Sequence, residues 1–269
     1  MLQMTTGIDP VANAAVLVQG IADAKAGGAA MLFTPEMSGL LDRDRARGAA
    51  RIVAEDADTV LMAVRSAAAE HGLWAHLGSL AVRRPDGRLA NRGFVIDDTG
   101  RVRARYDKIH LFDVDLPTGE SWRESVAYAP GESASVVQTP VGALGLSICY
   151  DLRFAALYGA LSDAGATVLS VPAAFTRPTG VAHWHVLLRA RAIETASWVI
   201  AAAQTGDHED GRETFGHSLV IDPWGEVMLD MGAEAGLGFA DIALERVAEV
   251  RGRIPVIAHR RAIPPVGAA

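Results

Sequence analysis

The chain has 269 residues, of which 50% are hydrophobic and 21% charged, the composition of an ordinary globular protein with a sizeable core. Its 25 Lys and Arg residues against 32 Asp and Glu give a net charge of −7, and no basic block stands out, which argues against a nucleic-acid-binding protein. The single cysteine, Cys149, excludes an intramolecular disulfide and any zinc site built from cysteines.

The first residues of the chain and the lengths of its apolar runs indicate its cellular location. The first residues, "MLQMTTGIDP", lack the basic stretch and apolar run of a secretory signal. The longest apolar stretches fall far short of the roughly 20 residues of a membrane helix. We therefore expect a soluble cytoplasmic protein that does not bind membranes.

In the first half of the chain, short strand-like runs alternate with helical ones. The pattern predicts a helix from Asp9 to about Ala26, a buried strand from Ala29 to Pro35, and a second helix in "DADTVLMAVRSAAAEHG", with Gly72 as its stop. Three β-like runs follow, separated by the turn signals "RPDG" and "DDTG": "LWAHLGSLAV", "NRGFVIDDTG" and "RVRARYDK".

In the second half the alternation resumes. "SVVQTPVGALGLSIC" predicts two strands around a turn, "ATVLSVPAAF" and "WVIAAAQTG" predict further strands, and "GHSLVIDPWGEVML" predicts a hairpin. Helices are predicted from Arg153 to Ala164 and from about Val181 to Ser197. A last strand is predicted near Phe239 to Ile242, and a short closing helix from Leu244.

This order of elements predicts an α/β fold in which helices cover the sheets. Strands alternate with helices at both ends of the chain, whereas the middle holds consecutive antiparallel-looking strands, which a purely parallel fold would lack. Without a linker, repeat or low-complexity tract, residues 1–269 are expected to form one domain. From about residue 251 the chain is rich in Pro and Arg, and we expect either a loose terminus or an arm packed on a neighbouring subunit.

Three residues could meet at one rim of a sheet, because each follows a predicted strand. Cys149 precedes a predicted helix, whose N-terminal partial charge would lower the thiol pKa and favour a nucleophilic thiolate. Glu36 could serve as a base and Lys108 could stabilise a developing oxyanion. Taken singly, each has a plain alternative: a small buried hydrophobe, a solvated loop carboxylate and a surface lysine.

Around these residues the sequence resembles a known family. "FTPEM", "YDKIHLFDVDLP" and "GLSICYDLRFAALY" are similar to the three signature segments of the nitrilase superfamily, the carbon–nitrogen hydrolases. Further agreement lies in "VPAAFTRPTGVAHWHVLLRARAIE", "AAAQTG" and "GHSLVIDPWGEV", so the likeness covers most of the chain. "KIHLFDVDLP", "WRES" and "TGVAHW" most resemble the amidase branch called Nit proteins, which contains deaminated glutathione amidase and omega-amidase.

The resemblance implies a four-layer α-β-β-α sandwich. It implies Glu36 as general base and acid, Lys108 as oxyanion stabiliser, Cys149 as nucleophile and Glu124, in "WRES", as a second glutamate that positions the lysine and the substrate amide. The backbone N–H of Tyr150 is expected to complete the oxyanion hole with Lys108. The leading strand is shorter than usual for the family, and we expect it to be frayed.

The expected reaction is hydrolysis of a small carboxylic or 2-oxo acid amide to acid and ammonia through a thioester, without metal or cofactor. An anionic substrate needs cations in its pocket, and Arg153 and Arg177 are the candidates, although Arg153 is equally consistent with a structural ion pair. His183 is expected at the pocket wall or behind it, since His183 and His185 face different ways on a helix and do not form a metal site.

Other functions stay open on the sequence alone. The same three residues could hydrolyse an N-carbamoyl compound or a nitrile. A non-catalytic scaffold that kept the fold is the alternative of another class. The resemblance also implies a homodimer or a higher homo-oligomer.

Overall fold

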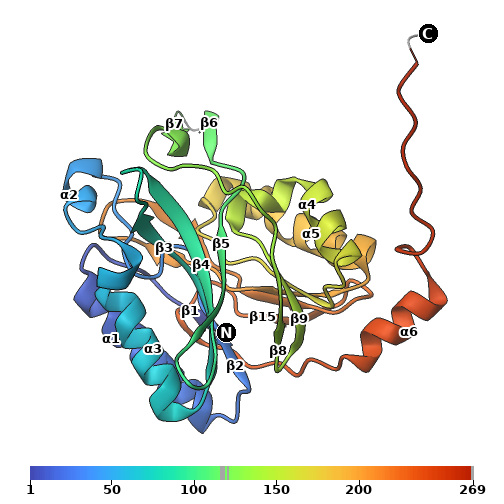
Figure 1. The fold of residues 1–269 in the computed structure, drawn as a ribbon, viewed down its shortest axis with the longest axis horizontal. Helices are drawn as coiled ribbons and strands as arrows, with labels where there is room; N and C mark the ends of the chain where they lie inside the picture. The colour runs from blue at the N-terminus through green and yellow to red at the C-terminus, as the bar shows by residue number, and fades with distance from the viewer. Residues whose placement is uncertain (116–118, 120, 268–269) are drawn as a thin grey trace.

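The computed structural model describes residues 1–115, 119 and 121–267. Two β-sheets pack face to face, and helices cover the outer face of each (Figure 1). The predicted four-layer α-β-β-α sandwich is therefore confirmed. No helix within the described part of the chain combines the length and the apolar content that a membrane crossing requires.

The first sheet has the order β2-β3-β4-β5, with β2 and β3 parallel and the other neighbours antiparallel. Helices α1 and α3 cover its outer face with apolar residues such as Leu17, Ile21 and Val64. The bounds of these elements are α1 Pro10–Ala26, β2 Met31–Phe33, α3 Thr59–His71, β3 Trp74–Arg83, β4 Leu89–Ile96 and β5 Val102–Asp107.

The second sheet has the order β15-β14-β11-β10-β9-β8, in which β9, β10 and β11 are parallel. Helices α4 and α5 pack on its outer face (Figure 1). The bounds are β8 Val136–Thr139, β9 Gly142–Leu146, α4 Ala155–Asp163, β10 Val168–Ser170, α5 Arg177–Thr195, β11 Trp198–Ala201, β14 Leu219–Ile221 and β15 Val227–Asp230.

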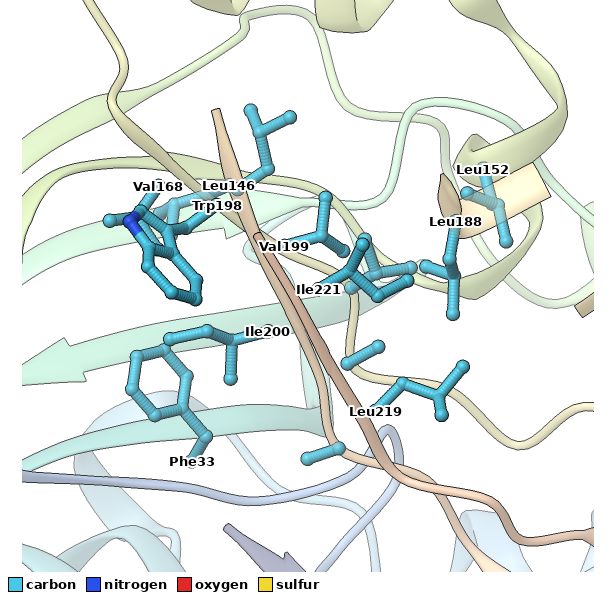
Figure 2. Close-up of a cluster of buried hydrophobic side chains, with 14 of the residues drawn as sticks. Phe33, Leu146, Leu152, Val168, Leu188, Trp198, Val199, Ile200, Leu219 and Ile221 are labelled. Carbon is cyan, nitrogen blue, oxygen red and sulfur yellow. The ribbon is translucent and has the colours of Figure 1, made fainter. Parts of the chain in front are cut away.

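The largest core cluster joins the two sheets. Phe33 of β2 lies near Ile200 of β11, and Trp198 and Ile221 extend the same cluster (Figure 2). All four side chains are at most 4% exposed. Each fully buried side chain of this size contributes about 1.5–3 kcal/mol, so this cluster fixes the sheets relative to each other.

In the first half of the chain, the residues that the sequence marks as helix starts and stops cap α1 and α3 in the structure. The Asp9 side chain accepts a hydrogen bond from the Val11 N–H and Pro10 opens α1. The Asp58 side chain accepts from the Leu61 N–H at 2.8 Å, and Gly72 ends α3 with a φ of 58°.

Three predicted elements differ in the structure. The helix expected from Arg153 is split into a 3₁₀ turn, η3 Cys149–Arg153, and α4, because Phe154 between them has a non-helical backbone conformation. Helix α5 begins at Arg177 rather than Val181, since the proline that follows is favoured in a first turn. The strand expected near residues 239–242 is absent; instead β16, Gly236–Leu237, pairs with the short strand β1, Leu2–Gln3.

The two ends of the chain also differ from expectation. Strand β1, Leu2–Gln3, is short, yet both residues are buried and the Gln3 amide donates to Gly232 and Glu234 carbonyls, so it is not frayed. Helix α6, Glu245–Arg253, continues past residue 251, so the irregular arm starts at residue 254. The start of the arm contacts α4, where the Arg260 guanidinium donates to the Gly159 carbonyl at 2.8 Å, and the described residues beyond it extend away from the body (Figure 1).

Shorter elements complete the chain around the sheets. Two hairpins, β6–β7 and β12–β13, are formed by antiparallel pairs of three residues each. Their bounds, with those of the remaining helices, are α2 Arg45–Ala49, η1 Glu55–Ala57, β6 Asp113–Asp115, β7 Ser121–Arg123, η2 Glu124–Val126, β12 Thr205–Asp207 and β13 Glu213–Phe215.

Two backbone segments pack very closely next to Glu36. Gly78 of β3 faces the segment that follows β2, and a Cβ at this position would lie 2.1 Å from the Thr34 carbonyl oxygen and 2.4 Å from that of Pro35. Only glycine allows the two backbones to pack at this distance.

We therefore expect Gly78→Ala to lower the free energy of unfolding by about 2 kcal/mol or more, because the segment carrying Glu36 must shift. Urea denaturation measures this, together with turnover of an amide substrate. The control is Gly252→Ala on α6, where nothing lies within 4 Å of the added Cβ. A Gly78→Ala protein with the stability and turnover of the wild type would contradict the steric argument.

Candidate active site

The structure brings together the three residues that the sequence singled out. Glu36 follows β2, Lys108 follows β5 and Cys149 opens the 3₁₀ turn after β9, so both sheets contribute to the site. Their exposed fractions are 5%, 2% and 7% respectively. The thiol of Cys149 is hydrogen-bonded to the Glu36 carboxylate.

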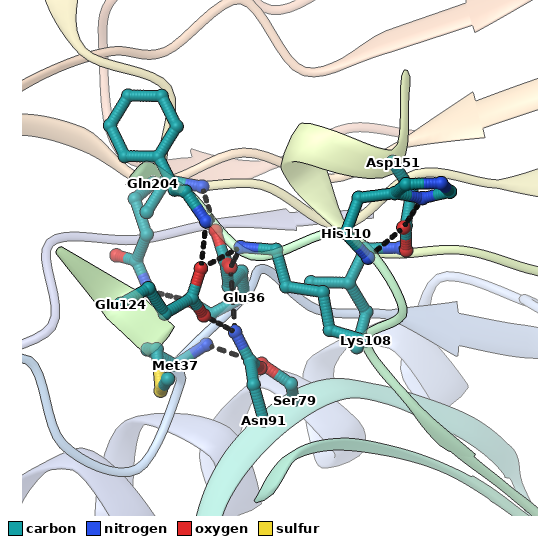
Figure 3. Close-up of polar contacts among 12 residues, drawn as sticks. Glu36, Met37, Ser79, Asn91, Lys108, His110, Glu124, Asp151 and Gln204 are labelled. Carbon is teal, nitrogen blue, oxygen red and sulfur yellow. Dashed lines mark hydrogen bonds and ion pairs between the residues drawn. The ribbon is translucent and has the colours of Figure 1, made fainter. Parts of the chain in front are cut away.

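Lys108 lies between two carboxylates (Figure 3). Its Nζ donates to Glu36 Oε1 at 2.9 Å and to Glu124 Oε2 at 2.9 Å. The same Glu124 oxygen accepts from the Phe112 N–H at 2.7 Å, which fixes the carboxylate. The structure thus places Glu124 on the ammonium group of Lys108.

Two residues that sequence reasoning missed also donate hydrogen bonds to the Glu36 carboxylate. Asn91 Nδ2 donates to Glu36 Oε1 at 2.8 Å and to Glu124 Oε1 at 3.1 Å, and the Ala174 N–H donates to Glu36 Oε2 at 2.9 Å. An asparagine inside a strand is unfavourable, and this was the one signal that could have revealed Asn91. Among the described residues, the Asn91 Oδ1 atom has no partner although it is buried.

The charges in this cluster set the protonation states. Burial raises the pKa of Glu36, but the Lys108 charge and hydrogen bonds from Lys108, Cys149 and Asn91 bring it below the ordinary 4.5. Burial disfavours the Lys108 ammonium, yet the two carboxylates raise its pKa well above the ordinary value. The resting site therefore holds a carboxylate and an ammonium at neutral pH.

The thiol behaves differently from the expectation based on a helix N-terminus. Burial, followed by the negative charge of Glu36, raises the pKa of Cys149 well above the ordinary 9.0, and Lys108 offsets only part of this. The expected lowering is wrong because α4 begins only at Ala155, while the nearest charge is a carboxylate. Cys149 is therefore a neutral thiol in the resting site.

The backbone on either side of the site adopts an unfavourable conformation. Met37 and Cys149 have φ values of 55° and 47°, in the left-handed region that non-glycine residues avoid. Specific bonds hold both positions: the Cys149 N–H donates to the Pro172 carbonyl at 2.9 Å and the Met37 N–H to Ser79 Oγ at 2.9 Å. Such local strain is typical of functional sites.

A buried aspartate joins the segment carrying Lys108 to the turn carrying Cys149. Asp151 is fully buried, and its carboxylate accepts from the Tyr106 hydroxyl at 2.7 Å, from the Ile148 N–H at 3.0 Å and from the His110 N–H at 2.9 Å. The His110 ring nitrogen Nδ1 lies 2.7 Å from the same carboxylate (Figure 3). These bonds fix the ammonium-bearing and thiol-bearing segments relative to each other.

The catalytic candidates line a cavity of about 620 Å³. Aromatic rings and arginines share its wall, and the guanidinium groups of Arg43 and Arg212 each lie 5.1 Å from the centre of the Trp122 ring. Of the five arginines among the described residues of this wall, sequence reasoning missed the four that come from segments far from Cys149 in the chain: Arg43, Arg45, Arg123 and Arg212.

The predicted substrate-binding residues fall in different places. Arg153 lines the cavity, with its guanidinium 5.4 Å from the centre of the Phe175 ring, and its Nη1 lies 3.3 Å from His183 Nδ1. His183 is exposed and lies behind Arg153 rather than in the cavity wall. Tyr150 lines the cavity beside the nucleophile.

Arg177 does not reach the cavity. Its side chain is 65% exposed and pairs with Glu213 at 3.3 Å on the surface, because it occupies the first turn of α5. The structure therefore gives no support to a substrate contact by Arg177.

Comparisons with known proteins identify the family of the chain. The carbon–nitrogen hydrolase family model matches residues 1–252. The deaminated glutathione amidase of Yersinia enterocolitica is 38% identical over 97% of this chain and 92% of its own length. That of Homo sapiens is 39% identical over 96% of this chain and 80% of its own length.

Two solved structures superpose on nearly the whole of this chain. The Caenorhabditis elegans NitFhit protein superposes with a TM-score of 0.89 at 38% identity, over 97% of this chain; this chain spans 64% of that fusion protein. A Glu-to-Gln mutant of the amidase from Nesterenkonia sp. AN1, with acrylamide added to its active-site cysteine, has a TM-score of 0.78 at 26% identity, over 95% of this chain and 96% of that one. The chain belongs to the carbon–nitrogen hydrolase family and is an enzyme of the amidase type.

Proposed function

We propose that the chain is a cysteine-dependent amidase that hydrolyses a 2-oxo-acid amide of the deaminated glutathione type through a thioester. The observation that carries the proposal is the buried group of Glu36, Lys108 and Cys149 at the wall of an arginine-lined cavity. The activity named for relatives that are 38% and 39% identical supports the choice of substrate.

The first step forms the thioester. The Glu36 carboxylate takes the Cys149 proton as the sulfur attacks the amide carbonyl carbon, which turns the carbonyl oxygen into an oxyanion. The Lys108 ammonium and the backbone N–H of Tyr150 stabilise that oxyanion. Protonated Glu36 then gives its proton to the nitrogen, the C–N bond breaks and the amine leaves.

The second step restores the enzyme. Glu36 takes a proton from a water molecule as the water oxygen attacks the thioester carbonyl carbon. When the C–S bond then breaks, Glu36 gives this proton to the leaving sulfur, which releases the acid and restores the Cys149 thiol and the Glu36 carboxylate. Glu124 does not exchange protons in this scheme; it holds the Lys108 ammonium in place through the 2.9 Å bond. No step requires a metal ion or an organic cofactor.

The nature of the leaving group depends on the substrate. A primary amide such as 2-oxoglutaramate releases ammonia, as we expected from the sequence. Deaminated glutathione has a secondary amide, so the amine that leaves is that of cysteinylglycine. The 620 Å³ cavity has room for a leaving group of this size, and its arginines complement the carboxylates at both ends of such a substrate.

We extend the proposal to the assembly and the compartment. The outer helices α4 and α5 expose small or apolar residues, among them Ala156, Val181 and Val186, and this surface suits a homodimer contact. A cysteine nucleophile must stay reduced, which fits the cytoplasm.

The first prediction concerns the reaction. We expect the wild type to release ammonia from 2-oxoglutaramate and 2-oxoglutarate from deaminated glutathione, and to leave an N-carbamoyl amino acid and an aliphatic nitrile intact. Cys149→Ala should abolish turnover because the nucleophile is gone, and Glu36→Gln should lower kcat by roughly 10²–10⁴-fold. Coupled assays for ammonia and 2-oxoglutarate measure both.

The control is urea denaturation, in which both variants should keep the wild-type midpoint. Hydrolysis confined to the N-carbamoyl compound or the nitrile would overturn the choice of substrate. Turnover that survives in Cys149→Ala or Cys149→Ser would overturn the nucleophile.

The second prediction concerns pH. The active form has Glu36 ionised, and its pKa lies below 4.5, so kcat/KM should fall only below about pH 5. On the alkaline side, the pKa values of Cys149 and Lys108 are both raised, so the decline should lie above about pH 9. Stopped assays across this range, with recovery of activity at pH 7 as the control, test the plateau. An ionisation between pH 6 and 8 would show that the assigned protonation states are incorrect.

The third prediction separates the two candidate arginines. Arg153→Met keeps the apolar stem but removes the charge, so KM for 2-oxoglutaramate should rise at least about tenfold, with a smaller effect on an uncharged amide. Arg177→Met is the matched control and should change neither KM, because the side chain lies outside the cavity. Equal effects of both substitutions, or equal effects on both amides, would contradict a substrate contact by Arg153.

A further inference from the structure

A second group of reactive side chains lies outside the reaction cavity. His185 comes from α5, His217 precedes β14 and Asp230 ends β15. Their ligand atoms all lie within 4.8 Å of one another. His185 Nε2 lies 2.9 Å from Asp230 Oδ2, and His217 Nδ1 lies 2.9 Å from Asp230 Oδ1. In the sequence only His183 and His185 stand close together, and the distant His217 and Asp230 give no local signal of this group.

The donor atoms are those of a transition-metal site. Two imidazole nitrogens and one carboxylate are ligands that zinc and its neighbours prefer, whereas Mg²⁺ and Ca²⁺ prefer oxygen ligands alone. Bonds of about 2.0–2.2 Å place the ligand atoms of a tetrahedral zinc ion about 3.4 Å apart. The histidine nitrogens now lie 2.9 to 3.2 Å from the Asp230 oxygens as hydrogen-bond partners, and all ligand atoms lie within 4.8 Å of one another. Small side-chain rotations that replace these hydrogen bonds would admit the ion.

The ligand side chains are held by their neighbours. The His217 ring stacks on Phe215 with 4.4 Å between centroids, and the His185 ring packs edge-on against both. The Gly232 N–H donates to Asp230 Oδ1 at 2.9 Å. Contacts of this kind orient metal ligands and reduce the entropy lost on binding.

The group is also open to solvent. The side chains of His185, His217 and Asp230 are 35%, 29% and 34% exposed, so an ion can reach them without unfolding. It is a neighbour of the reaction cavity and not part of it: Phe215 separates them, and its N–H donates to the carbonyl of Phe175, a cavity residue.

We propose that His185, His217 and Asp230 bind one divalent transition-metal ion, with Zn²⁺ as the best fit, and that a solvent molecule completes the coordination. The ion would link α5 to the β14–β15 hairpin. The proposal does not depend on the proposed amidase function, because none of the three residues belongs to the reaction cavity.

The test is isothermal titration calorimetry of tag-free protein, stripped with EDTA, against ZnCl₂ and MgCl₂. We expect one Zn²⁺ per chain, a higher thermal midpoint at saturation and no binding of Mg²⁺. His185→Ala and Asp230→Asn should each weaken Zn²⁺ binding by roughly tenfold or more, since each removes a ligand. Circular dichroism without metal confirms that both variants are folded.

Two matched controls locate the ion. His183→Ala removes a histidine from the same helix and should leave Zn²⁺ binding unchanged. Cys149→Ala removes the single thiol of the chain, which is also a strong zinc ligand, and should leave Zn²⁺ binding unchanged too. Absence of saturable Zn²⁺ binding, binding that survives His185→Ala, or binding that disappears with Cys149→Ala would each overturn the proposal.

Discussion

The site depends on one buried ammonium group held between two carboxylates. Lys108 has bonds of 2.9 Å to both Glu36 and Glu124, and the three side chains are at most 12% exposed. Burial of either carboxylate alone would be very unfavourable, so removal of Lys108 would leave two uncompensated charges. Burial of Cys149, together with the negative charge of Glu36, explains a thiol that stays protonated until Glu36 takes its proton.

The surrounding fold serves to keep these groups in register across two sheets. Asp151 connects the Lys108 segment to the Cys149 turn through four short contacts. The Gln204 side chain donates to the Glu36 carbonyl at 2.9 Å and so fixes the backbone that carries Glu36. Since a misplacement of about 1 Å can cost roughly 100-fold in rate, these buried polar contacts matter to catalysis as well as to stability.

The sequence predicted sheets covered by helices, most strands and the residues that end them, because hydrophobic periodicity and caps are local signals; the four-layer sandwich was implied by the resemblance. Glu36, Lys108 and Cys149 could be placed at one rim for that reason, and Glu124 only through resemblance. Asn91 and the cavity arginines other than Arg153 could not be found, since their proximity depends on how distant segments pack. The pKa of Cys149 was predicted in the wrong direction because burial and the charge of Glu36 outweigh a helix end that lies several residues away.

In the resting enzyme a neutral Cys149 thiol lies next to an ionised Glu36, and the proposed mechanism starts from this state. The ultraviolet absorbance of thiolate, taken as the difference between wild type and Cys149→Ala, measures the ionisation of Cys149. We expect no thiolate absorbance between about pH 6 and 8, and its appearance only above the ordinary thiol pKa of 9.0. A full thiolate signal at neutral pH would show that Cys149 is ionised without any action of Glu36, and the neutral resting thiol would then be wrong.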